Sequence, residues 1–165
     1  MRSLPRIAAL SALALTGLTG CRSSQVWFSG DEDLTEVLTD HMGTSSDTLD
    51  VAVYTFTSEP IRDALIDADS RGVQVRVVID GWETNDPIAA SLREAGVPTR
   101  RASGYNDGIM HHKFAIVDAQ SVATGSFNFT IAANESNDEN LLIVSDQALA
   151  GQYTNAFDAL WKRAE

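Results

Sequence analysis

The spacing of apolar positions alternates between two periods along the chain. Short runs rich in β-branched and aromatic residues predict strands at 26–29, 49–56, 73–80, 96–101, 110–118, 121–124 and 140–144. Apolar residues three or four positions apart predict helices at 31–41, 58–70, 88–95 and 146–162. Because strands and helices alternate with short connections, we expect an α/β fold with a mixed, largely parallel β-sheet flanked by helices on both faces.

The first residues carry the pattern of an export signal. Arg2 and Arg6 precede an apolar stretch at 7–18 that is too short to span a bilayer, and the tetrapeptide Leu-Thr-Gly-Cys ends at Cys21. This tetrapeptide resembles the lipobox of bacterial lipoproteins, which implies cleavage before Cys21 and lipidation of that residue. An ordinary secretory leader with an incidental cysteine is the alternative reading.

These features predict how the chain is organised. We expect a lipoprotein signal peptide at 1–20, a lipidated tether at 21–25 and one domain at 26–165, exported and anchored by lipid at the bacterial cell envelope. Cys21 is the only cysteine, so no disulfide can form within the chain despite export.

The charge of the chain bears on its partners. Without Arg2 and Arg6, ten basic and 23 acidic residues remain, a net charge of −13. Such a surface repels polyanions and counts against a nucleic-acid substrate. A local basic cleft remains possible, since Arg100, Arg101 and Lys113 lie on neighbouring predicted segments.

The candidate chemistry lies in the second half of the chain. Side chains alternate between the two faces of a strand, so His111 and Lys113 project together, while His112 projects to the opposite side. Ser126 and Asn128 likewise share a face. One face therefore presents a nucleophile beside donors suited to phosphate oxygens, which indicates phosphoryl transfer. The full pattern is His111, Lys113 and Asp118, then Gly125, Ser126 and Asn128, then Glu139.

In order and spacing this pattern resembles the H-x-K-x(4)-D and G-S-x-N motifs of the phospholipase D superfamily, followed by its glutamate. Segments 54–58, 64–68 and 71–76 also resemble small single-motif members, which include bacterial endonucleases and mitochondrial cardiolipin hydrolase. The resemblance covers nearly all of the mature chain. It implies a phospholipase D-like fold, a covalent phosphohistidine intermediate and, for single-motif members, a homodimer with a shared active site.

The chemistry assigns a role to each side chain. An imidazole, whose ordinary pKa is about 6.5, is largely neutral and nucleophilic at neutral pH, so we expect His111 to attack phosphorus while Lys113 neutralises the phosphate oxygens. Its second nitrogen needs an acceptor. Family members use the glutamate, and alternation turns Asp118 away, so we assign Glu139 to orient His111 and Asp118 to a structural hydrogen bond.

In-line displacement also needs a general acid on the far side of the phosphate. His111 cannot occupy both sides, His112 faces away, and His41 lies on a distant predicted helix. The acid is therefore expected from His111 of a second copy in a two-fold dimer. No metal or other cofactor is expected, because adjacent histidines on a strand face opposite ways and no second ligand cluster lies nearby.

Three functions remain open. The first is a phospholipid phosphodiesterase, favoured by the anchor at Cys21 and by Trp82 and Tyr105 in loops that could contact headgroups. The second is a metal-independent endonuclease acting on DNA or RNA, favoured by the similarity to small bacterial nucleases. The third is a non-catalytic binding module at the envelope, against which the complete set of functional groups argues.

Overall fold

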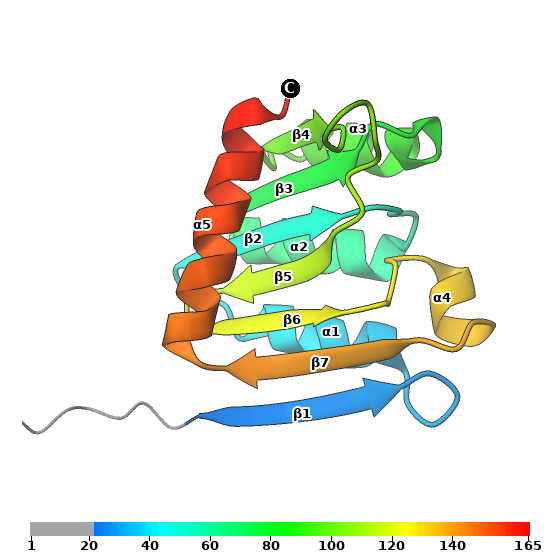
Figure 1. Ribbon diagram of the computed structural model, residues 1–165, viewed down its shortest axis with the longest axis vertical. Helices are drawn as coiled ribbons and strands as arrows, with labels where there is room; N and C mark the ends of the chain where they lie inside the picture. Colours follow the sequence, from blue (N-terminus) through cyan, green and yellow to red (C-terminus); the bar gives the residue numbers. More distant parts are fainter. Residues whose placement is uncertain (1–21) are drawn as a thin grey trace, which may run out of the picture.

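A single seven-stranded sheet organises the protein. The computed structural model describes residues 22–165, so the expected signal peptide and Cys21 lie outside the described residues. The strands follow the spatial order β1-β7-β6-β5-β2-β3-β4 (Figure 1). Their bounds are β1 Ser23–Phe28, β2 Thr48–Val53, β3 Gln74–Asp80, β4 Thr99–Ala102, β5 Lys113–Val117, β6 Ser121–Gly125 and β7 Asn140–Ser145.

The expected α/β fold with a mixed sheet is confirmed, but the expectation that the sheet is largely parallel is wrong. β2 pairs in parallel with β3, and β3 with β4. The other neighbours, from β1 through β7, β6 and β5 to β2, pair antiparallel. Parallel pairing is therefore limited to β2, β3 and β4, which follow one another in the chain and are connected by α2 and α3.

Helices cover both faces of the sheet, as expected. α1 (Leu34–Gly43), α2 (Glu59–Ser70) and α3 (Asp86–Glu94) lie on one face, and the long α5 (Gln147–Arg163) crosses the other (Figure 1). Leu34, Leu38 and Met42 form the buried stripe of α1, at the spacing of one helix face. Asp146 caps α5 by accepting hydrogen bonds from the N–H groups of Ala148 and Leu149.

Each face of the sheet has its own core. The larger core lies under α1, α2 and α3, and the smaller one lies between the sheet and α5. Phe114 of β5 and Phe157 of α5 meet in the smaller core with their ring centroids 6.5 Å apart. These two cores fix the strands between rigid layers, so the ends of the strands are held in constant positions.

Three local expectations are corrected by the structure. Ser23–Phe28 pair with β7 along their length, so the polar segment expected as a tether is mostly strand. β5 begins at Lys113 instead of residue 110, which leaves His111 and His112 just before the strand. A short helix, α4 (Ile131–Glu135), and a 3₁₀ turn at Glu83–Asn85 were not predicted.

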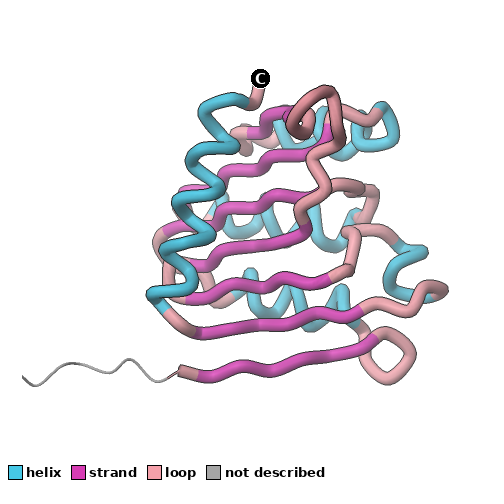
Figure 2. The backbone as a smooth tube through the Cα atoms, in the orientation of Figure 1, coloured by secondary structure: helices cyan, strands magenta, loops and turns pink. Residues whose placement is uncertain are grey.

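The ends of several strands meet at one edge of the sheet. Figure 2 shows the loops that follow β2, β3 and β6 beside the segment that enters β5. None of the helices within residues 22–165 is long and apolar enough to cross a membrane.

Candidate active site

His111 and Lys113 form a close pair at the loop-rich edge of the sheet. The Lys113 Nζ atom lies 3.4 Å from each ring nitrogen of His111 and donates a hydrogen bond to the His111 carbonyl oxygen at 3.1 Å. Burial lowers the pKa of Lys113, and the negative charge of Glu139 opposes this effect. A nucleophile and a cation thus lie together, as strand alternation predicts.

The backbone before β5 is held from two neighbouring segments. The Tyr54 N–H donates to the His112 carbonyl oxygen at 2.9 Å, and the Met110 N–H donates to Asp80 Oδ2 at 2.8 Å. His112 turns to the opposite side from His111 and packs near Phe114, with ring centroids 5.4 Å apart. Burial lowers the pKa of His112, and the positive charges of Arg163, Lys113 and His111 lower it further.

Gly125 and Ser126 bring β6 against β7 beside this pair. A Cβ atom on Gly125 would overlap the carbonyl oxygen of Asn140, so this position requires glycine. The Ser126 hydroxyl donates to the carboxylate of Glu139 and accepts the Asn140 N–H at 3.1 Å. Asn137 also donates to Glu139, at 3.2 Å.

Glu139 differs from the expectation that it orients His111. Its carboxylate binds Ser126 and Asn137, and no hydrogen bond joins it to His111 among residues 22–165. Directly after β1, the Ser29 hydroxyl accepts the Glu139 N–H at 2.7 Å and holds its backbone. Ser29 was missed by sequence reasoning, because its role depends on the pairing of strands far apart in the chain.

Asn128 retains unused hydrogen-bonding capacity. Its Oδ1 atom is buried and has no partner within the described part of the chain. The next residue, Phe129, bridges to Phe56, and its N–H donates to the Thr55 carbonyl oxygen at 3.0 Å. Asn128 is thereby docked against the segment that follows β2, at the same edge as His111.

Asp118 lies at the opposite end of β5 and stabilises the fold there. Its carboxylate accepts hydrogen bonds from the N–H groups of Ser46, Asp47 and Thr48 and from the Ser46 hydroxyl, at 2.8–3.2 Å. Burial alone would raise the pKa of Asp118, but these hydrogen bonds lower it. Asp118 therefore has a structural position away from the His111–Lys113 pair.

An aromatic wall stands beside the catalytic candidates. The Tyr54 and His111 ring centroids are 4.6 Å apart, and the Lys113 Nζ atom lies 5.2 Å from the Tyr54 centroid. Trp82 stacks on Tyr54 at 5.9 Å with its ring 51% exposed. Sequence reasoning placed Trp82 in a substrate-facing loop but did not single out Tyr54.

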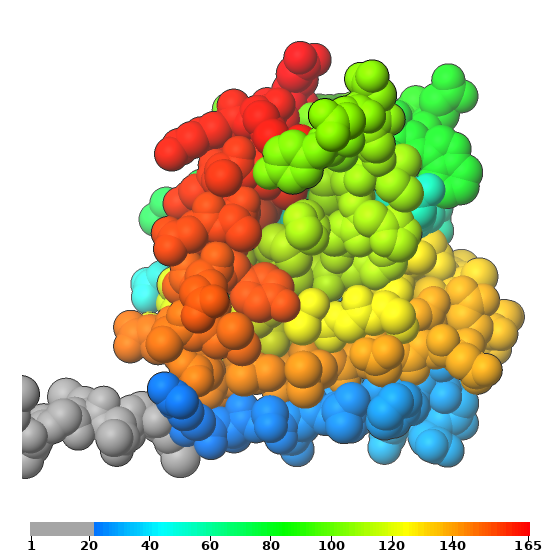
Figure 3. Space-filling model, viewed as in Figure 1, coloured from blue at the N-terminus to red at the C-terminus, as the bar shows by residue number. Residues whose placement is uncertain are grey.

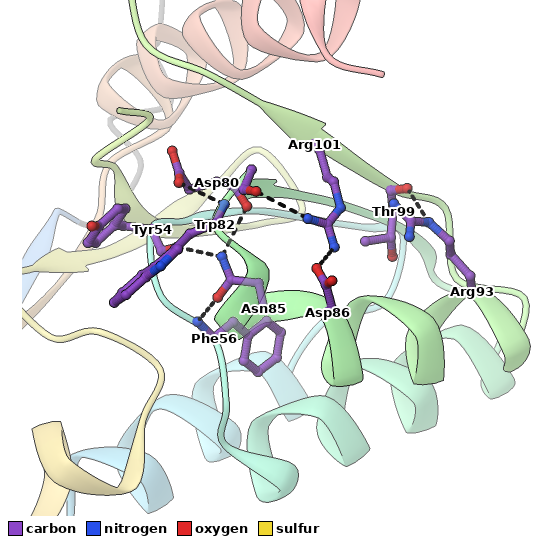
Figure 4. Close-up of polar contacts among 10 residues, drawn as sticks. Tyr54, Phe56, Asp80, Trp82, Asn85, Asp86, Arg93, Thr99 and Arg101 are labelled. Carbon is purple, nitrogen blue, oxygen red and sulfur yellow. Dashed lines mark hydrogen bonds and ion pairs between the residues drawn. The ribbon is translucent and has the colours of Figure 1, made fainter. Parts of the chain in front are cut away.

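A buried polar brace holds this wall (Figure 4). Asn85 is fully buried and donates to the carbonyl oxygens of Tyr54 and Asp80, at 2.9 and 3.0 Å. Its Oδ1 atom accepts the Phe56 N–H at 2.8 Å. Asp80 accepts the Trp82 N–H at 3.1 Å in addition to that of Met110. The brace thus links the ends of β2 and β3 to the segment that carries His111.

The other candidates from the sequence lie elsewhere. Arg100 stacks on Trp161 at 4.3 Å and binds its carbonyl oxygen, and Arg101 pairs with Asp86. Tyr105 is 81% exposed, with Arg163 over its ring. No group of three or more potential metal ligands occurs among residues 22–165. The site thus contains one lysine beside an imidazole and amide and hydroxyl groups, a donor set suited to phosphate rather than to a metal ion.

Comparisons with known proteins agree with this geometry. Residues 38–161 match the family model for the PLD-like domain of cardiolipin synthase. The chain is 33% identical to mitochondrial cardiolipin hydrolase of Chlamydomonas reinhardtii, covering 86% of this chain and 64% of the relative. It is 43% identical to the Xenopus tropicalis protein of that name, covering 69% and 54%.

Among solved structures, the chain is similar to Nuc of Salmonella typhimurium, described as a phospholipase D family member. The TM-score is 0.81 at 30% identity, covering 87% of this chain and 97% of Nuc. The chain spans only half to two-thirds of the length of the curated relatives named above. The match of residues 38–161 to the family model and the identity to these relatives show that this chain belongs to the phospholipase D superfamily.

Proposed function

We propose that the protein hydrolyses phospholipid phosphodiester bonds through a covalent phosphohistidine intermediate. The observation that carries this proposal is the His111–Lys113 pair, with Nζ 3.4 Å from the imidazole nitrogens at an open edge of the sheet. Asn128 offers a further polar group, and Ser126 joins the site through Glu139. These groups suit a phosphate that is attacked by an imidazole.

The reaction has two steps. An imidazole nitrogen of His111 attacks phosphorus, the bond to the leaving oxygen breaks, and a general acid protonates that oxygen. Water then attacks the phosphohistidine and releases His111. Lys113 offsets the charge on the phosphate oxygens, while the charge of Glu139 favours the protonated ammonium of Lys113.

We propose that the general acid is His111 of a second copy in a two-fold homodimer. His112 faces the α5 side, near Phe114, so it cannot lie across the phosphate from His111. His41 is engaged with Ser121, 3.1 Å from its Oγ atom, at the far end of the sheet. Mass measurement of the active protein should therefore show a dimer, and full activity in a strict monomer would contradict the shared site.

The lipid substrate is supported by charge and by the proposed anchor. Residues 22–165 include 23 acidic side chains, and Arg100 and Arg101 are held by Trp161 and Asp86 rather than free to bind a polyanion. We also propose that Cys21 is lipidated and holds the domain at the envelope membrane, which raises the local concentration of headgroups. Cys21→Ala should move the protein from the membrane to the soluble fraction.

The substrate is tested with a panel of phosphatidylcholine and cardiolipin vesicles and single- and double-stranded DNA, each with excess chelator. Cleavage of lipid with intact DNA is expected. A chelator-sensitive activity restored by a divalent ion would contradict attack by His111. Binding of a ligand with no turnover of any diester would favour a non-catalytic envelope module.

A metal-independent nuclease is the second candidate, and the Tyr54–Trp82 stack favours it. Aromatic faces beside a cation can stack bases of a single strand. If DNA or RNA is cleaved while both lipids stay intact, if Trp82→Ala weakens that cleavage, and if added salt suppresses it, then the nuclease replaces the lipase.

A further inference from the structure

A cavity of about 420 Å³ opens beside His111 and Lys113, between β5, β6 and α5. Figure 3 views this face, with the side chains of α5 in orange and red beside the strands in green and yellow. Neither Tyr54 nor Trp82 lines the cavity. The catalytic pair forms part of its lining, but the side of the cavity formed by α5 has no role in the reaction steps described above.

Away from the catalytic pair, the cavity is lined by a group of apolar side chains from α5 and β5 and by the polar Gln152, Thr124 and His112. Leu149, Tyr153 and Ala156 face it from α5, at the spacing of one helix face. Phe114 forms part of the lining from β5, and Tyr153 packs edge-on against it with ring centroids 5.1 Å apart. Burial and neighbouring positive charges lower the pKa of His112, so this lining imidazole is neutral near neutral pH.

The charges along the cavity do not suit a nucleic-acid strand. Of the side chains that line it, Lys113 is the one permanent cation, and it belongs to the catalytic pair. A strand of nucleic acid requires a series of cations along its backbone. A volume in the range of small-molecule sites, apolar side chains on its α5 and β5 sides and a position beside the phosphate-binding pair fit a hydrocarbon chain attached to the scissile phosphate.

We propose that this cavity binds an acyl chain of the phospholipid while His111 attacks its phosphate. This inference rests on the proposed phospholipid function and identifies the part of the lipid that supplies binding energy. Each methylene buried there should raise kcat/KM by up to about fourfold, until the cavity is filled.

The test compares two substrates in the full-length protein at a fixed low detergent concentration. One is a series of phosphatidylcholines of increasing acyl length below their micelle concentrations, and the other is bis(p-nitrophenyl) phosphate, which has no chain. Ala156→Trp places a large ring in the cavity from an exposed helix position, so folding should persist. We expect kcat/KM to fall at least about tenfold for the longest lipids and to change less than about twofold for the small diester.

Gln152→Trp is a second filling variant, also at an exposed lining position. Ala148→Trp is the matched control, because Ala148 is also an exposed residue of α5 but does not line the cavity. The dependence of kcat/KM on acyl length should flatten in both filling variants and persist in the control.

Three results would overturn the proposal, and they separate its failure from that of the proposed function. If the wild type cleaves lipids and the filling variants keep its chain-length dependence, the cavity does not bind the chain, while the lipase function stands. Equal losses on both substrates would show that the cavity serves the phosphate instead. If the wild type cleaves the small diester but no lipid, both the function and the cavity's occupant are wrong.

Discussion

The two ends of β5 carry two halves of one motif and use their polar groups in opposite ways. At the start, Lys113 and His111 face each other at 3.4 Å, and the imidazole of His111 has no other hydrogen-bonding partner within residues 22–165. At the far end, Asp118 is surrounded by four donor groups from residues 46–48. The polar groups at the first end are therefore available to a substrate, whereas those at the second end stabilise the fold.

The same contrast holds for the backbone. Asp118 and Ala119 adopt positive φ values of 53° and 51° in a tight turn, and the Asp118 hydrogen bonds compensate for this costly conformation. At the start of β5 the chain is extended, and the buried groups of Asp80 and Asn85 hold it from the side. The position of the catalytic pair thus depends on Asp80 and Asn85, which come from other parts of the chain. The far end of β5 is stabilised instead by the loop at residues 46–48.

The largest effect is expected from His111→Asn. Removing the nucleophile should lower kcat by at least about 10³-fold on any diester. Since His111 is exposed, the free energy of unfolding should stay within about 0.5 kcal/mol of the wild type. Turnover and urea denaturation measure the two quantities.

His112→Asn is the matched control for this variant, because its side chain faces α5. It should retain most activity toward a small diester. Comparable losses in both variants would show that the two faces of the segment before β5 do not have separate roles, and would remove the basis of the comparison.

Asn85→Ala should give the next largest effect, by breaking the brace. Three hydrogen bonds of a fully buried amide are lost and their backbone partners are left unpaired, so unfolding should become easier by about 2–4 kcal/mol. Tyr54 and Asp80 would lose the side chain that joins them. We therefore expect kcat to fall as well, when it is measured well below the melting temperature.

The activity of the folded fraction decides whether Asn85 positions the site. If kcat per folded molecule is unchanged while stability drops, then Asn85 stabilises the protein without positioning His111. Thr99→Ala is a suitable comparison, because Thr99 is buried at the edge of β4 but does not contact the brace.

Much of this site could be predicted from the sequence, because the spacing of its residues along the chain indicates which side chains lie together. Alternation along a strand separated His111 from His112, and it placed Asp118 away from the nucleophile. The residues that sequence reasoning missed act across strands. Ser29 meets Glu139 over 110 positions of sequence, and Asn85 meets Tyr54 over 31. Such contacts depend on sheet order, which periodicity does not determine.

The error on sheet pairing has a related cause. The strand–helix–strand pattern from 49 to 80 correctly indicated parallel neighbours, and β2 and β3 pair in this way. In the second half of the chain, β5 and β6 are joined by a tight turn and pair antiparallel, while β6 and β7 are joined by a longer segment that contains α4. The sequence predicts a tight turn at Ala119 and Gln120, but this turn does not determine that β5 also pairs antiparallel with β2.

A smaller effect is expected from Asp118→Asn, which tests the structural end of β5. An amide cannot accept all four donors as a carboxylate does, and the site is partly exposed, so the free energy of unfolding should fall by about 1–2 kcal/mol. The value of kcat/KM at low temperature should stay within about twofold of the wild type. A large loss of activity in fully folded protein would contradict a purely structural role.

The pH dependence of this loss follows from the lowered pKa of Asp118. In the unfolded chain an aspartate titrates near about pH 3.9, whereas in the folded protein it stays ionised to lower pH. The stabilisation is therefore complete above about pH 5 and is lost as pH falls through the folded pKa. Asp118→Asn should narrow the difference in urea midpoint between neutral pH and about pH 3.

The smallest effect concerns the two neutral histidines, one at each end of the sheet. Burial lowers the pKa of His41, which contacts Ser121 at the same end of the sheet as Asp118. Burial is also the main cause of the lowered pKa of His112 at the other end. An unfolded histidine takes up a proton near about pH 6.5, so in this window the unfolded state binds more protons than the folded state. The free energy of unfolding should thus be highest above about pH 7 and decrease as pH falls toward about pH 5.

Replacing each histidine by glutamine separates the two contributions. His41→Gln and His112→Gln should each flatten this decrease, and the double variant should flatten it further than either single variant. Urea midpoints at constant m-value, measured between about pH 7.5 and about pH 5, give the result. If both single variants and the double variant keep the full slope, then burial of His41 and His112 does not cause the loss of stability in this window, which lies above the pH range in which Asp118 changes its own contribution.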